Sequence, residues 1–177
     1  MSPFTLTALE RSPDELDAEL AADLWAASTA GAGYDDVAAR WLSRPTLLRR
    51  LAAGLARHIP ATADRIAAGG PGAAALGAAV SLWTGLPFVS FPAGRDEPTL
   101  GELDRGDQVV AVAVSVATAQ ELVPRLRAHE AVIAAVAVVV ADDDHLDQPG
   151  GPGRCDRAGE PRTIALVRRK PHGYFPA

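Results

Sequence analysis

Two apolar runs separated by a helical segment constrain the fold of this chain more than any other feature. The first run is Gln108–Ser115 (QVVAVAVS), and the second covers residues 131–141 (AVIAAVAVVVA). The residues between them, VATAQELVPRLRAHE, have the spacing of a helix. Runs this apolar are typical of strands covered on both faces, so the unit predicts two parallel strands joined by a helix.

The flanking sequence extends this unit into a larger α/β pattern. Two helices are expected first, at residues 12–28 and at about 45–58, the first of them with Ser12 as a capping residue. Short strands are expected at residues 65–68 and 86–91, separated by a helix of small residues that ends at Gly85. We predict a single domain over residues 1–177, divided as follows: N-terminal helices at 12–60, a core at 64–142, a flexible Gly/Pro-rich loop at 146–161, and a last strand with a basic tail at 162–177.

Composition excludes several classes of function. The 177 residues are 48% hydrophobic, which suits one core, and the formal net charge is −5. An acidic chain has no general attraction to nucleic acid or to anionic lipid, so neither is expected as a partner. No apolar run reaches the roughly 18 residues of a membrane helix. Cys155 is the only cysteine, so no disulfide can form within the chain, and a cytoplasmic location is expected.

Several segments resemble the orotate phosphoribosyltransferases. Residues 66–89 (IAAGGPGAAALGAAVSLWTGLPFV) are similar to the family's pyrophosphate loop, the helix after it and the sequence TGLP. Residues 101–118 (GELDRGDQVVAVAVSVAT) are similar to its hairpin and its VVDDVxTTG ribose-phosphate motif. Residues 131–142 and 43–56 resemble its next strand and its first long helix. The resemblance implies the type I phosphoribosyltransferase fold, a mostly parallel twisted sheet flanked by helices, here with a reduced hood.

The resemblance also implies a reaction and its requirements. In that family, the sugar phosphate PRPP binds with magnesium, a nitrogenous base attacks the anomeric carbon, and pyrophosphate leaves. Charge separates during this reaction, so the site needs cations at the leaving group, N–H donors at the phosphate and acids at the ribose hydroxyls.

The ribose-phosphate motif of this chain lacks the family's chemistry. Val114 and Ser115 stand where the family has two adjacent acids, and moving the alignment by one residue restores neither. The turn that holds the 5′-phosphate has become Ala117 to Gln120, without glycine. A phosphate at the N-terminus of the following helix and a purely structural turn both remain open. The candidate ligand-binding residues in this degenerate loop are Ser115, Thr118, Ala119 and Gln120.

The pyrophosphate loop and the catalytic loop are similarly altered. Gly69, Gly70 and Gly72 remain as the equivalent of the pyrophosphate loop, as a binding turn or simply a flexible one, but Gly72 replaces a family arginine. The long lysine-bearing loop is reduced to AGRDEPTLG, in which Arg95 is the only cation. Tyr34, in the loop sequence STAGAGYDD, is the one counterpart of the family's base-recognition tyrosine, or an ordinary loop residue.

Three other groups of residues are candidates for a metal-binding, catalytic or anion-binding site. The run from Asp142 to His145 follows a strand and suits either a hard metal or a solvated strand end. Cys155 lies near arginines but has no histidine partner at a recognisable spacing. The C-terminal patch Arg168, Arg169, Lys170 and His172 is either a phosphate or acidic-partner site or a solubilising tail. We predict no metal site and no catalytic residue.

The sequence leaves two hypotheses for function. The first is a protein of nucleotide metabolism that has lost PRPP-dependent catalysis and acts by binding a nucleotide, a phosphorylated small molecule or a protein partner. The second is an active phosphoribosyltransferase of altered specificity, and only this one requires Mg²⁺. Because the family commonly dimerises through the face near its pyrophosphate helix, a homodimer is expected. Exposure of Trp41 or Trp83 would favour such an interface.

Overall fold

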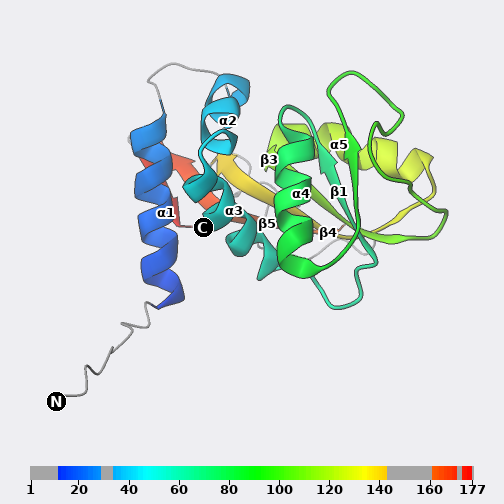
Figure 1. The fold of residues 1–177 in the computed structure, drawn as a ribbon, viewed down its shortest axis with the longest axis horizontal. Helices are drawn as coiled ribbons and strands as arrows, with labels where there is room; N and C mark the ends of the chain where they lie inside the picture. The colour runs from blue at the N-terminus through cyan, green and yellow to red at the C-terminus, as the bar shows by residue number, and fades with distance from the viewer. Residues whose placement is uncertain (1–11, 29–33, 143–160, 171–172, 177) are drawn as a thin grey trace, which may run out of the picture.

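A computed structural model describes residues 12–28, 34–142, 161–170 and 173–176 (Figure 1). The predicted loop at 146–161, with Cys155, lies almost entirely outside this range, as do Asp143 to His145 and His172. The helices are α1 (Pro13–Ala27), α2 (Tyr34–Leu42), α3 (Pro45–Ala56), α4 (Ala73–Thr84) and α5 (Val116–Ala128). The strands are β1 (Arg65–Gly69), β2 (Phe88–Phe91), β3 (Gln108–Ser115), β4 (Val132–Asp142), β5 (Arg162–Lys170) and β6 (Gly173–Pro176).

The strands form one mixed sheet in the order β2-β1-β3-β4-β5-β6. The first five strands in this order are parallel, and β6 pairs antiparallel with β5 at one edge. The strand, helix and strand predicted from the two apolar runs are β3, α5 and β4. The predicted parallel sheet flanked by helices is therefore confirmed.

Helices cover both faces of the sheet, and the strand order explains which helix lies on which face. The chain passes from β1 through α4 to β2 in one direction, and from β3 through α5 to β4 in the other. Right-handed crossovers in opposite directions place their helices on opposite faces. Accordingly, α4 packs with α1, α2 and α3 on one face, and α5 covers the other (Figure 1). No helix in the described ranges is long and apolar enough to cross a bilayer.

The N-terminal helices follow the sequence signals closely. Ser12 and Glu15 form a capping box at the start of α1, with Ser12 N–H donating to the Glu15 carboxylate at 2.8 Å. Leu20 and Leu24 are buried against α3, whose Leu51 and Leu55 are fully buried. These contacts place a leucine-rich layer under the helices, as the four-residue spacing predicts.

The prediction of a loop around Tyr34 is wrong, because helix α2 begins at this residue. Its apolar residues Val37, Ala38, Trp41 and Leu42 recur at helical spacing and are all buried. The Trp41 indole N–H donates to the Leu24 carbonyl at 3.2 Å, which joins α2 to α1. The free energy gained by burying these apolar side chains outweighs the preference of the preceding glycines for a loop.

The C-terminal segment also differs from its prediction. The last strand continues through Arg168 and Arg169 to Lys170 as β5, and the chain then returns as β6. Strand β6 contacts α1, so the segment expected to be a basic tail is part of the sheet. Arg169 lies opposite Asp142 of β4, which places opposite charges side by side at this end of the two strands.

Candidate functional site

The predicted site residues lie in two segments at the carboxyl ends of the neighbouring strands β1 and β3. Strand order reverses at this point of the sheet, and in open α/β sheets ligands bind at such a switch point, beyond the carboxyl ends of the strands. Gly69 ends β1 and is followed by the turn to Gly72, whereas Ser115 ends β3 and is followed by α5, which contains Thr118 to Gln120. The pairing of β1 with β3 thus brings together two segments that are distant in the sequence.

The turn after β3 is a direct junction between strand and helix. Strand β3 ends at Ser115, and α5 begins at the next residue, Val116. Ser115 is 4% exposed and caps the helix, its Oγ accepting the Thr118 backbone N–H at 3.2 Å. The hydroxyls of Ser115 and Thr118 lie 2.9 Å apart and hydrogen-bond to each other. An N–H that a phosphate would otherwise contact is therefore bound to a side chain of the chain itself.

The glycines after β1 lie directly against α5. Gly70 has a φ of +84°, and a Cβ added there would overlap the Thr118 methyl group. A Cβ at Gly69 would lie 2.9 Å from the Leu122 side chain. These glycines are thus explained by positive φ and by close packing of the turn on α5. Their retention alone does not require a ligand.

Helix α2 covers the other side of the same turn. Gly72, with a φ of +72°, is the N-cap of α4 and has no side-chain cap. A Cβ at Gly72 would overlap Leu42, the last residue of α2, which is 8% exposed. Leu42 is not among the predicted site residues, because the sequence analysis does not predict helix α2, which positions it. Its helical spacing from Ala38 was the available signal.

The remaining predicted ligand-binding residues point in different directions. Ala119 is 2% exposed and packs in the core with Leu122, whereas Gln120 is exposed. Of these four residues, Thr118 lies against the glycine turn, and Ser115 is hydrogen-bonded to Thr118. Neither GGPGA (residues 69–73) nor VSVATAQ (residues 114–120) contains a charged residue.

These residues do not fit magnesium-bound PRPP. Val114 and Ser115, which replace the acid pair, are both buried and offer no carboxylate for ribose hydroxyls. Within the described residues, no three His, Cys, Asp or Glu side chains lie close enough together to hold a metal ion. Because these two segments carry no charged residue, they offer no counter-charge to the phosphate groups of a sugar diphosphate. No transfer step can be derived from this arrangement.

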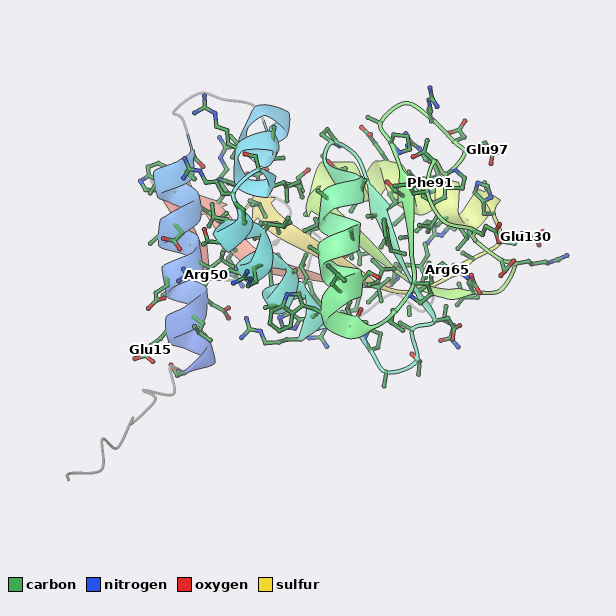
Figure 2. The ribbon with its side chains drawn as sticks, in the orientation of Figure 1. Glu15, Arg50, Arg65, Phe91, Glu97 and Glu130 are labelled. Atoms are coloured by element: carbon green, nitrogen blue, oxygen red, sulfur yellow. The ribbon has the colours of Figure 1, made fainter. Side chains whose placement is uncertain are left out.

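The shortened equivalent of the catalytic loop is held against α5. The Arg125 guanidinium donates to the Pro92 carbonyl at 3.1 Å, and His129 Nε2 lies 3.2 Å from the Asp96 carbonyl. Backbone bonds between Ser90 and residues 99 and 100 close the base of the loop. Figure 2 labels Phe91, the last residue of β2, and Glu97, which lies within the loop. The Phe91 carbonyl, just before Pro92, accepts the Gly70 N–H at 3.1 Å, so the loop begins beside the glycine turn and is also bonded to α5.

The layer of helices α1, α3 and α4 carries an open surface, whose lining combines apolar residues with Asp17, Arg50 and Arg57. A hollow of about 460 Å³ lies between α1, α3 and Trp83 of α4, over a floor that includes Ala53 and Gly54. Arg50, labelled in Figure 2 between α1 and α3, forms ion pairs with Glu19 and Asp23 at its rim. Trp83 is 54% exposed, whereas Trp41 is fully buried.

Comparisons with solved structures agree with this topology. The orotate phosphoribosyltransferase of Mycobacterium tuberculosis H37Rv, in complex with 5-phospho-alpha-D-ribosyl 1-diphosphate, superposes with a TM-score of 0.65. It is 17% identical, over 90% of this chain and 91% of that one. The adenine phosphoribosyltransferase of Trypanosoma brucei, in complex with AMP, pyrophosphate and ribose-5-phosphate, has a TM-score of 0.58 and 15% identity, over 90% and 81%.

The chain has the type I phosphoribosyltransferase fold. A third structure with this likeness is the UMP synthase of Leishmania donovani, with a TM-score of 0.55 and 25% identity over 73% of this chain. The chain spans only 28% of the length of that synthase. No protein-family model and no curated protein matches the sequence. The phosphoribosyltransferase likeness is therefore one of fold, and it assigns no activity.

Proposed function

We propose that this chain is a non-catalytic protein with the phosphoribosyltransferase fold, which acts through contact with a protein partner. The observation that carries this proposal is the direct junction of β3 and α5. A transferase needs acids and a phosphate-holding turn at this junction, and here Val114 and Ser115 pass straight into a helix that caps itself.

The position of the shortened loop supports the same proposal. Closure of a loop over a substrate excludes water from a transferase site. In this chain, Arg125 and His129 of α5 contact the Pro92 and Asp96 carbonyls of the loop. The loop would have to break these contacts before it could cover a ligand.

Helix α4 supports a role in protein contact. Its sequence, AAALGAAVSLWT, contains no charged residue, although Ala74, Ala75, Leu82 and Trp83 are exposed. A helix that is apolar on both its inner and its outer face is normally covered. We propose that a second copy of the chain covers it. Two chains of net charge −5 repel each other, and a charge-free helix is where that repulsion is smallest.

Catalysis is tested by incubating the full chain with PRPP, Mg²⁺ and each common purine and pyrimidine base while pyrophosphate release is measured. We expect no release above that of a heat-inactivated control. Turnover that disappears in Ser115→Ala would overturn the proposal and favour the alternative, an active enzyme of altered specificity.

Partner contact is tested by light scattering over a range of protein concentrations. We expect a dimer for the natural chain and a monomer for Leu82→Glu. A second copy covering α4 would have to bury the new carboxylate without a counter-charge, which is costly. Leu100→Glu is the matched control, since Leu100 is also exposed but lies on the loop after β2. A monomer at every concentration, or equal loss in both variants, contradicts a dimer through α4.

A further inference from the structure

The hollow between α1, α3 and α4 has the size of a small-molecule site. Its volume of about 460 Å³ lies within the range of about 300–1,000 Å³ that is typical of such sites. The space exists because α3 contributes the small residues Ala53, Gly54 and Ala56 to its lining. Helix α3 also lies close to the sheet there, since a Cβ on Gly54 would be 3.0 Å from the Leu166 side chain of β5. The hollow is thus formed by packed helices and by the sequence of α3.

Each of the three charged residues in the lining is already in an ion pair. Arg57 pairs with Asp17, and Arg50 pairs with Asp23 and, at 3.5 Å, with the Glu19 carboxylate. The acids belong to α1, whereas the arginines belong to α3 and to the residue after it, so these pairs join the two helices. A charged ligand would have to compete with one of these pairs, whereas an uncharged ligand leaves them intact. The electrostatics of the hollow therefore favour an uncharged ligand.

The apolar part of the lining includes an exposed aromatic ring. Trp83 is 54% exposed, and Leu16, which lines the same hollow, is 43% exposed. Trp83 and Ala56 also line a neighbouring hollow of about 390 Å³, so the indole borders open space in both. An indole stacks on other flat rings, and covering Trp83 and Leu16 would remove apolar surface from water. The lining is therefore suited to a flat, apolar ring system.

We infer that this hollow is a binding site for a small, uncharged aromatic molecule, which stacks on Trp83 and contacts Leu16 and Ala53. The site lies in the layer of helices, apart from the turns after β1 and β3. It does not depend on the proposed contact between two copies of the chain, because Leu82, the residue that tests that contact, does not line the hollow.

The test uses two fluorescent probes that share a ring system and differ in charge. N-phenyl-1-naphthylamine is uncharged, and 1-anilinonaphthalene-8-sulfonate carries an added sulfonate. Each probe is titrated into the full chain while its fluorescence, which rises in apolar surroundings, is measured. We expect equimolar, saturable binding of the uncharged probe in the micromolar range, and binding of the sulfonate weaker by about tenfold or more. Equal affinities for the two probes overturn the inference, as does a lack of saturable binding by the uncharged probe.

Two variants test whether the uncharged probe binds in the hollow. Ala53→Phe places a ring in the space, and Trp83→Ala removes the aromatic surface. Each should weaken binding by about tenfold or more, because packing or stacking contacts are lost. Circular dichroism verifies the fold of each variant, and Trp83→Ala, a change at a half-exposed residue, decides the test if Ala53→Phe does not fold. Unchanged binding in either folded variant overturns the inference.

Two further variants are controls. Ala26→Phe adds the same ring at an exposed position of α1 outside the hollow, and it should bind the uncharged probe as the natural chain does. Leu82→Glu, the variant designed to be monomeric, should also bind normally. Loss of binding in Leu82→Glu would place the site between two copies and overturn a site within one chain. Equal loss in Ala26→Phe and Ala53→Phe would overturn the location of the site.

Discussion

The carboxyl and amino edges of the sheet differ in how closely side chains pack around their glycines. At the carboxyl edge, Gly70 lies against Thr118, Gly72 lies against Leu42, and Ser115 caps the helix beside them. At the amino edge, Gly85 also has a positive φ, but a Cβ there would meet nothing within 4 Å. The turn after β1 is therefore packed against neighbouring side chains, whereas Gly85 faces open space. Glycines with the same positive φ thus have different packing environments at the two edges.

The largest expected effect comes from substituting a glycine at each edge. Gly85→Ala places a Cβ at positive φ in open space, so it should lower the free energy of unfolding by about 1 kcal/mol. Gly70→Ala carries the same conformational cost and also overlaps the Thr118 methyl, so about 3 kcal/mol is expected. Urea denaturation measures both values. Equal losses would mean that the carboxyl edge is not packed as described.

A second, intermediate effect is expected where the loop after β2 is bound to α5. Arg125→Met keeps the aliphatic stem but removes the hydrogen bond to the Pro92 carbonyl, which should cost about 1 kcal/mol. Amide hydrogen exchange of residues 93–100 should increase. Arg127→Met, two residues along the helix at an exposed position, is the control and should leave the loop unchanged. Unaltered exchange in Arg125→Met would show that the loop is held by other contacts.

The smallest effect is a pH dependence at the amino edge. Partial burial, followed by the nearby Arg57, lowers the pKa of His58, and Asp17 opposes this only in part. The unfolded chain then binds a proton more readily than the folded chain, so stability falls as the pH drops through about 6.5. His58→Gln should reduce the loss of Tm between about pH 7.5 and pH 5.5. An identical pH profile in the variant would remove His58 as the cause.

The sequence predicts the central part of this fold well and its margins less well. The bounds of β3 and the cap at Ser12 are confirmed, because both depend on local patterns. Helix α2 was missed because the glycines before Tyr34 favoured a loop, and the burial of Trp41 that stabilises the helix depends on distant residues. Strand β6 was missed because its pairing with β5 follows a proline and a basic run.

Prediction of the candidate site was limited in the same way. The absence of acids at Val114 and Ser115 is visible in the sequence, and so is the loss of turn glycines. The packing of Gly70 against Thr118 is not, because these residues are far apart in the chain and meet only when β1 and β3 pair. Sequence patterns show which groups a segment lacks, whereas the fold shows which side chains lie against it.

The short strands at the two margins of the sheet limit how the molecule can aggregate. An unpaired outer strand can add a strand from another molecule, and short or proline-containing strands resist this. On one margin, β6 is short and ends at Pro176. On the other, the backbone N–H and carbonyl of Ser90 in β2 are already bonded to Leu100 and Thr99. Addition of a strand from another molecule is therefore disfavoured at both margins of the sheet.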